Sequence, residues 1–332
     1  MANLVINNRC NRKCPYCFAM HTMPGHRPQD MPLPDVVQIA DHVIAAGGKQ
    51  LGVLGGEPTL HPHCVEICLY LLRRSLKVDL LTNGIADDAT IARFRAIPSG
   101  APFEVMVNVN FPEITPAHER ERQRAFLTAL GRRCCISLNM YRVDLDPCFA
   151  VELGASCGTS KTVRVGLAQP ILDATNENLG LEHYRAAAAQ IVRLAEASRR
   201  IGGLVTFDCG IPLCAFTDAQ LGALYRSGTD FNFVCSPVVD ISMDLDTWAC
   251  FPFSQGKHIP LRDGRSIPDL HKLYREEWAR LRAAHQADGI FAECGSCSYR
   301  RAQRCAGGCL SHALRLGDGP RPHAPVAITE ER

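Results

Sequence analysis

Three cysteines stand close together near the start of the chain, in the segment Cys-Asn-Arg-Lys-Cys-Pro-Tyr-Cys. They are Cys10, Cys14 and Cys17. Thiolates are the usual ligands of iron–sulfur clusters, and one loop with this short spacing can reach three irons of a [4Fe–4S] cubane. The fourth iron would then lack a protein ligand and could accept a chelating molecule. Because His21 or His26 could complete a tetrahedral site, the spacing alone also leaves zinc open.

A second and denser group of cysteines lies in the last part of the chain. Its eight members are Cys209, Cys214, Cys235, Cys250, Cys294, Cys297, Cys305 and Cys309. A closed [4Fe–4S] cluster takes four thiolates, so eight thiols match two clusters by number. The last four have the spacing C-x2-C-x7-C-x3-C, which is also compatible with a zinc ribbon. The spacing therefore predicts a metal-binding region without choosing between the metals.

Composition limits the class of protein. The 332 residues carry a net charge of +2, with 46% hydrophobic and 21% charged residues, so neither nucleic acid nor a membrane surface is expected as a partner. No segment approaches the roughly 20 apolar residues that span a bilayer, and the N-terminus lacks the pattern of a secretory signal. We therefore expect a cytoplasmic protein whose 17 cysteines are reduced.

The elements that must position these cysteines follow a regular alternation. Short apolar runs occupy residues 4–6, 51–54, 78–81, 103–109, 135–138 and 163–167, with helical patterns near 34–46, 62–75, 87–96, 116–130 and 147–154. Such alternation is typical of βα units around a parallel sheet, and six units predict an α/β fold with a partial (β/α)6 TIM-like barrel. The ligand site of such folds lies at the carboxyl ends of the strands.

The residues at these strand ends are glycines and amides. Gly55-Gly56-Glu57-Pro58 follows the second run and Thr82-Asn83-Gly84 the third, while Asn108, Asn139 and Gln169 lie at the ends of the next three. Adjacent glycines let the backbone approach a ligand closely and expose its N–H and C=O groups. Each of these residues taken alone could be a simple turn residue. Together they predict a shared polar pocket.

The three-cysteine loop, with Tyr16 before its last cysteine, and the Gly55-Gly56-Glu57-Pro58 segment resemble the radical S-adenosylmethionine (SAM) superfamily. The resemblance covers roughly the first 170 to 200 residues. It implies a [4Fe–4S] cluster on the three loop cysteines, whose open iron chelates SAM. It also implies reductive cleavage of SAM to a 5′-deoxyadenosyl radical, which takes a hydrogen atom from the substrate.

The same resemblance implies contacts to SAM. The backbone of Gly55, Gly56 and Glu57 would hold the amino group, and Tyr16 would lie near the adenine. Candidates for ribose and carboxylate contacts are Asn83, Asn108, Asn139 and Gln169.

An alanine-rich helix predicted from Leu181 to Ile201 ends at Gly202-Gly203, which marks a domain boundary. We expect a barrel domain over residues 1–203, a small cysteine-rich domain over 204–316, and a disordered tail over 317–332, which is rich in Pro, Gly and charge.

The cysteine-rich domain resembles the SPASM extension of radical SAM enzymes, because two of its cysteines flank a predicted hairpin at residues 238–248. The resemblance implies two auxiliary [4Fe–4S] clusters. One would be held by Cys235, Cys250, Cys309 and either Cys214 or Cys209, and the other by Cys294, Cys297 and Cys305.

Two features depart from the SPASM pattern. Leu245 stands where the family has a glycine, and no cysteine follows Cys309 to complete the second cluster. The missing ligand could be the spare member of the Cys209 and Cys214 pair, a non-cysteine residue or the substrate. Alternatively a single auxiliary cluster forms, as in the shorter twitch variant. A thiol at 209 or 214 that binds no metal could instead return a hydrogen atom to a substrate radical, giving epimerisation.

We expect a radical SAM/SPASM enzyme that modifies a peptide, by the side-chain cross-linking or C–H functionalisation found in ribosomally made peptide products. Because the barrel begins almost at residue 1, the peptide would be held by the barrel, the extension or a separate recognition protein. An external one-electron donor such as a flavodoxin or ferredoxin is expected. The alternatives are an alcohol dehydrogenase or epimerase acting on a sugar or aminocyclitol, and a non-catalytic electron carrier, which would not need the Gly55-Gly56-Glu57 segment.

Overall fold

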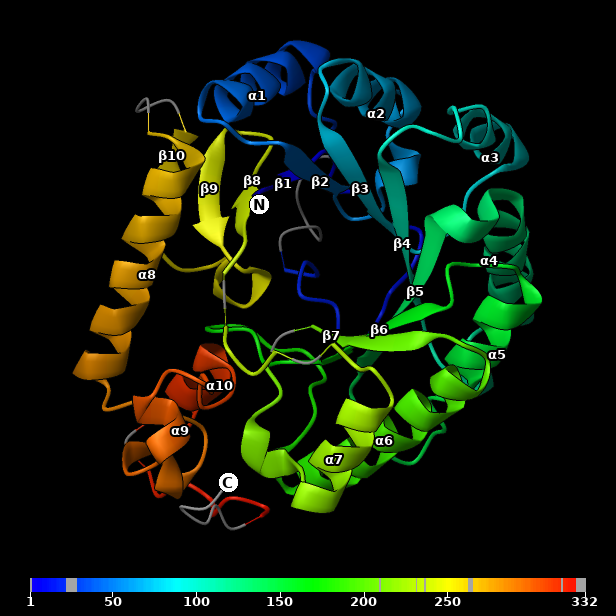
Figure 1. The fold of residues 1–332 in the computed structure, drawn as a ribbon. Coiled ribbons are helices and arrows are strands. Elements are labelled where there is room, and N and C mark those ends of the chain that lie inside the picture. The colour runs from blue at the N-terminus through cyan, green and yellow to red at the C-terminus, as the bar shows by residue number, and fades with distance from the viewer. Residues whose placement is uncertain are drawn as a thin grey trace.

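Seven parallel strands follow one another across the sheet in sequence order. They are β1 (Ala2–Val5), β2 (Gln50–Leu54), β3 (Lys77–Thr82), β4 (Phe103–Val109), β5 (Cys134–Met140), β6 (Thr162–Leu167) and β7 (Leu204–Phe207). The structure is a computed structural model that describes residues 2–21, 29–208, 210–230, 232–235, 237–261, 265–317 and 319–326. In Figure 1 the sheet curves around a central space, with the connecting helices on its outer side. The predicted partial TIM-like barrel is confirmed.

Six helices connect these strands: α1 (Leu33–Ala45), α2 (Cys64–Arg73), α3 (Asp88–Arg95), α4 (Ala117–Leu130), α5 (Phe149–Ser156) and α6 (Tyr184–Arg200). Their apolar residues recur at helical spacing. In α1 the buried positions are Val36, Ile39, Ala40 and Val43, one stripe facing the sheet. The side chain of Asp87 accepts a hydrogen bond from the backbone of Thr90 and caps α3. All the strands and helices predicted for the first 170 residues are present, with small shifts at their ends.

The sheet contains more strands than the six predicted. β7 pairs in parallel with β6, and β8 (Val239–Ile241) pairs in parallel with β1. β8 also forms an antiparallel hairpin with β9 (Asp246–Ala249), and β10 (Ile259–Pro260) pairs with β9. The predicted hairpin is therefore confirmed, and it is joined to the barrel sheet along β1. The domain boundary at residue 203 stays a prediction.

Leu245, in the turn of this hairpin, has a φ of 62°. This left-handed conformation is easy for glycine and costs other residues about 1–2 kcal/mol. Leu245 is also buried, at 9% exposure, and packs in the main core. The backbone thus keeps the shape that a glycine would favour, while the leucine adds apolar contact.

The remaining helices are α7 (Asp218–Arg226), α8 (Ile267–Ala284), α9 (Ser298–Arg301) and α10 (Leu310–Arg315). Figure 1 shows α9 and α10 between α8 and α7. Part of the predicted tail follows this region closely, because Arg321 Nη1 donates to the carbonyl oxygen of Gly289 at 2.8 Å. Residues 327–332 lie outside the described part, and the disorder of the tail stays a prediction. Among the described residues, no helix has both the length and the apolar character needed to cross a membrane.

Candidate functional site

The two N-terminal motifs are held against each other by backbone hydrogen bonds. Gly56 N donates to Asn7 O at 3.0 Å, and Glu57 N donates to Arg9 O at 2.6 Å. Asn7 Nδ2 returns a bond to Glu57 O at 2.8 Å. A Cβ on Gly55 would lie 2.4 Å from Asn7 Oδ1, so the approach leaves no room for a side chain there. The segment that leads into the three-cysteine loop is therefore fixed to the end of β2.

The carboxylate of Glu57 joins the ends of β2 and β3. It is fully buried and accepts hydrogen bonds from Thr59 N (3.0 Å), Thr59 Oγ1 (2.7 Å), Thr82 Oγ1 (2.5 Å) and Asn83 N (2.7 Å). Burial raises the pKa of this carboxyl group, and the hydrogen bonds oppose that rise because they stabilise the charged form. The side chain is thus occupied in holding the strand ends together.

Three further contacts hold the cysteine loop, and none of them was predicted from the sequence. Asn83 Nδ2 donates to Asn11 Oδ1 at 2.7 Å, and Asn11 Nδ2 donates to Ile85 O at 2.8 Å. Arg12 Nε lies 2.9 Å from Glu119 Oε2 in an ion pair whose side chains are 6% and 17% exposed. The sequence gives no signal for these contacts, because they form only when the ends of β3 and α4 meet the loop in space.

A cavity of about 340 Å³ opens over the carboxyl ends of the strands, and we call it the main cavity. The three loop cysteines line it, and so do all the predicted SAM contacts, which are Tyr16, Gly55, Gly56, Glu57, Asn83, Asn108, Asn139 and Gln169. Asn139 Nδ2 donates to Asn108 Oδ1 at 3.3 Å, and Tyr184 Oη donates to Gln169 Oε1 at 3.4 Å. The structure therefore brings together every residue that was predicted for the first site.

Three cysteines of the second group face this same cavity. Cys235, Cys250 and Cys309 line it on the side of the β8–β9 hairpin and α10. Burial, and then the nearby Cys309, raise the pKa of Cys235 to about 12. Cys209 lies outside the described residues, while its chain neighbours Asp208 and Gly210 line the main cavity.

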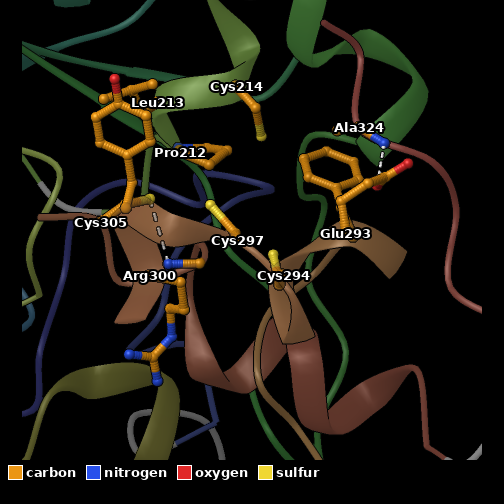
Figure 2. Close-up of a pocket in the computed structure, with 12 residues that line it drawn as sticks. Pro212, Leu213, Cys214, Glu293, Cys294, Cys297, Arg300, Cys305 and Ala324 are labelled. Carbon is orange, nitrogen blue, oxygen red and sulfur yellow. Dashed lines mark hydrogen bonds between the residues drawn. The ribbon is translucent and has the colours of Figure 1, made fainter. Parts of the chain in front are cut away.

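The other four cysteines line a second cavity. They are Cys214, Cys294, Cys297 and Cys305, and Figure 2 shows them around a common space. Cys214 thus accompanies the three later cysteines instead of Cys235, Cys250 and Cys309. Sequence reasoning left this pairing open, because Cys214 lies far from the other three along the chain.

The chemistry of the loop thiols fits a metal cluster. Burial raises the pKa of Cys10 to about 12 and that of Cys17 to about 11, so both thiols would be neutral near pH 7 without a metal. A bound metal deprotonates such thiols outright. Among the described residues, no three or more Cys, His, Asp or Glu side chains converge closely enough to hold a single ion. The three loop cysteines line the main cavity together, and a cluster with several irons could bind them there.

Comparison with other sequences agrees with this chemistry. Residues 4–125 match the Radical SAM superfamily. The chain is 26% identical over 342 residues to the PqqA peptide cyclase of Ruegeria pomeroyi, a match that covers 97% of this chain and 85% of that protein. A shorter match, 32% identical over 83 residues, joins 24% of this chain to 21% of the mitochondrial GTP 3',8-cyclase of Arabidopsis thaliana.

Comparison with solved structures agrees with the fold. SuiB of Streptococcus suis bound to S-adenosylmethionine superposes with a TM-score of 0.68 at 12% identity, over 98% of this chain and 77% of SuiB. SuiB bound to its precursor peptide SuiA gives a TM-score of 0.66 at 13% identity, over 97% and 74%. The superfamily match and the cysteine loop fixed beside the Gly55-Gly56-Glu57 segment identify a radical SAM domain over residues 4–125, and the fold of the chain is shared with SuiB.

Proposed function

We propose that this enzyme modifies a peptide, by cross-linking side chains oxidatively or by functionalising another C–H bond. The observation that carries the proposal is the main cavity, which the three-cysteine loop and the set Cys235, Cys250 and Cys309 both line. A substrate in that space would lie between the site of radical formation and an auxiliary redox site. Similarity to a PqqA peptide cyclase along 97% of the chain supports the peptide as substrate.

In this proposal Cys10, Cys14 and Cys17 hold the [4Fe–4S] cluster that binds SAM. When both cofactors are bound, they supply the 5′-deoxyadenosyl radical. The Gly55-Gly56-Glu57 backbone would hold the SAM amino group, and Tyr16 would lie near the adenine. The ribose and carboxylate of SAM would be contacted by the amides of Asn83, Asn108, Asn139 and Gln169. The ion pair of Arg12 and Glu119 keeps the loop in place.

The inner wall of the main cavity is suited to polar groups of a substrate. Arg164 Nη2 lies 2.6 Å from Asp208 Oδ1, and Asn3 Nδ2 donates to Asp240 Oδ1 at 2.8 Å. All four residues line the cavity. The main cavity has a volume of about 340 Å³ and would also hold SAM in this proposal, so we expect only a small part of the peptide to enter it.

Two auxiliary [4Fe–4S] clusters belong to the proposal, carried by residues 204–316. We propose Cys235, Cys250 and Cys309 for the cluster at the main cavity, with Cys209 as its fourth ligand. A flavodoxin or ferredoxin would supply electrons, and a separate protein could present the peptide.

The test is anaerobic turnover of the reduced enzyme with SAM and a candidate precursor peptide, sought among the short reading frames beside its gene. We expect 5′-deoxyadenosine together with a peptide that has lost two hydrogen atoms, measured by mass spectrometry. The Cys14→Ala variant should form neither product, because its SAM cluster lacks a ligand. Cys157→Ala is the matched control, since Cys157 is buried and packs in the core away from both cavities.

Two results would count against the proposal. If the wild-type enzyme carries its cluster intact but releases no 5′-deoxyadenosine, the radical chemistry is wrong. If it oxidises or epimerises a sugar or aminocyclitol and leaves the peptide unchanged, the substrate is a small molecule.

A further inference from the structure

Cys214 lies in a 3-10 turn, Leu213–Ala215, and faces the cysteines of a segment that follows much later in the chain. In Figure 2 the thiols of Cys214, Cys294 and Cys297 point into the space between them, and Cys305 borders the same space. All four cysteines line the second cavity, so they form one group in space although Cys214 lies far from the other three along the chain.

The backbone separates this group from the main cavity. Gly307 and Gly308, with φ of 71° and 81°, stand between Cys305 and Cys309. A Cβ on Gly307 would lie 2.8 Å from Asp288 O, and one on Gly308 would lie 2.5 Å from the Ile290 side chain. Only glycines can make this turn, and it sends Cys305 to the second cavity and Cys309 to the main one.

We propose that a closed [4Fe–4S] cluster is held by Cys214, Cys294, Cys297 and Cys305. No cysteine follows Cys309 in the chain, and Cys214 provides the fourth ligand instead. We call this the Cys214 site. The inference rests on the iron–sulfur chemistry of the proposed function and assigns one site within it. Four thiolates are a full ligand set for such a cluster, and the chain needs no ligand from the substrate there.

The four thiols do not form a preformed tetrahedral zinc site. With Zn–S bonds of about 2.3 Å, the sulfurs of a tetrahedral zinc site stand about 3.8 Å apart and converge on one point. Within the described residues no group of three or more ligand side chains has that convergence. The second cavity has a volume of about 10 Å³ in this structure, so its walls would have to open to admit a cluster.

A closed ligand set determines what the Cys214 site can do. No iron is left to bind SAM or a substrate, so its role is electron transfer. Pro212, Leu213 and Phe291 form an apolar part of its wall, which limits contact with water.

The test is metal and sulfide analysis of the protein purified and reconstituted anaerobically. The wild type should hold about twelve irons, and Cys214→Ser should lose about four of them or show the EPR signal of a three-iron cluster. Cys157→Ser, which changes a buried thiol outside both cavities, should keep the wild-type iron content. SAM cleavage without substrate should stay at the wild-type level in Cys157→Ser, because the loop cysteines and the Cys214 site are both unchanged.

A second measurement on the wild-type protein covers the case in which Cys214→Ser does not fold. As a chelator removes iron, Cys214 should become open to alkylation in step with Cys294, Cys297 and Cys305, while Cys157 stays protected. Wild-type iron content in a folded Cys214→Ser variant, or stoichiometric zinc in the wild type, would overturn the assignment. Both readouts are independent of the peptide, so a failure of peptide modification would refute the proposed function and leave the Cys214 site standing.

Discussion

The side chain of Glu57 holds the ends of β2 and β3 together beside the proposed SAM site. Its carboxylate accepts bonds from Thr59, Thr82 and the backbone of Asn83. Family resemblance assigns its backbone to SAM, and the structure adds a separate role for its side chain. This role could not be predicted from sequence, because the partners come from two different strand ends.

Changing Glu57 to Gln tests that role. In the wild type, four donors share the two oxygens of the carboxylate. The glutamine side chain has one acceptor oxygen, and its N–H₂ group would face donors with which it cannot form hydrogen bonds. We expect the free energy of unfolding to fall by about 1–3 kcal/mol, measured by urea denaturation near pH 7. The exposed residue Glu152 provides the control, and Glu152→Gln should change stability by no more than about 0.5 kcal/mol. Equal stability of the two variants would show that the hydrogen bonds of Glu57 are not needed.

At the scale of elements, β2, β1 and β8 share one row of residues facing the main cavity. Asn3 is in register with Gly52 on one side and Asp240 on the other. A Cβ on Gly52 would lie 2.1 Å from Asn3 Oδ1, so the glycine leaves room for the amide that donates to Asp240. Gly52 thus makes room for the side chain of Asn3, which donates a hydrogen bond to the buried carboxyl group of Asp240.

Asp240 should make stability depend on pH. Burial raises its pKa to about 7, although the bond from Asn3 opposes the rise. The unfolded chain, with a pKa near 3.9, releases this proton earlier, so the folded state binds more protons between about pH 4 and 7. The free energy of unfolding should therefore fall as pH rises through that window. Asp240→Asn removes the penalty and should be the more stable protein at pH 8, by at most roughly 4 kcal/mol.

Thermal unfolding at pH 5 and pH 8 checks this prediction. The difference in Tm between Asp240→Asn and the wild type should be larger at pH 8 than at pH 5. Asp244 is exposed in the hairpin turn, and Asp244→Asn should have the Tm of the wild type at both pH values. A gap that does not change with pH would mean that Asp240 is ionised throughout.

The elements differ in how far sequence predicts them. The first six strands are apolar runs with clear boundaries, and the hairpin has an alternating pattern, so both were predicted. β7 is a run of only four residues, Leu204–Phe207, and three of them are half-buried. Its pairing with β6 depends on where α6 returns the chain. The pairing of β8 with β1 joins residues 239–241 to residues 2–4, and no local pattern in the sequence predicts a contact between segments so far apart.

Over the whole molecule, the last four cysteines divide between two cavities, and Arg282 of α8 lies near both. Its guanidinium interacts electrostatically with Cys235 and Cys309 of one set and with Cys294 of the other. Burial lowers the pKa of Arg282, but an arginine with a reference pKa above 12 stays charged. Sequence alone predicts the ligands and cannot place this cation, because α8 precedes the quartet and packs on it only after folding.

That cation should influence the reduction potentials of the proposed auxiliary clusters. Reduction adds negative charge to a cluster, and a partly buried positive charge nearby stabilises the reduced form. We therefore expect Arg282→Gln, which keeps a hydrogen-bond donor for the Ala287 carbonyl, to shift the auxiliary potentials to more negative values. Arg282→Lys should restore them in part. The measurement is an anaerobic redox titration followed by EPR, with iron content equal to wild type.

Arg280→Met, on the exposed side of the same helix, controls for loss of charge at a distance, and its potentials should match the wild type. If Arg282→Gln shows the same potentials as Arg280→Met, solvent already screens the charge, and the two clusters are tuned by their own ligands and burial.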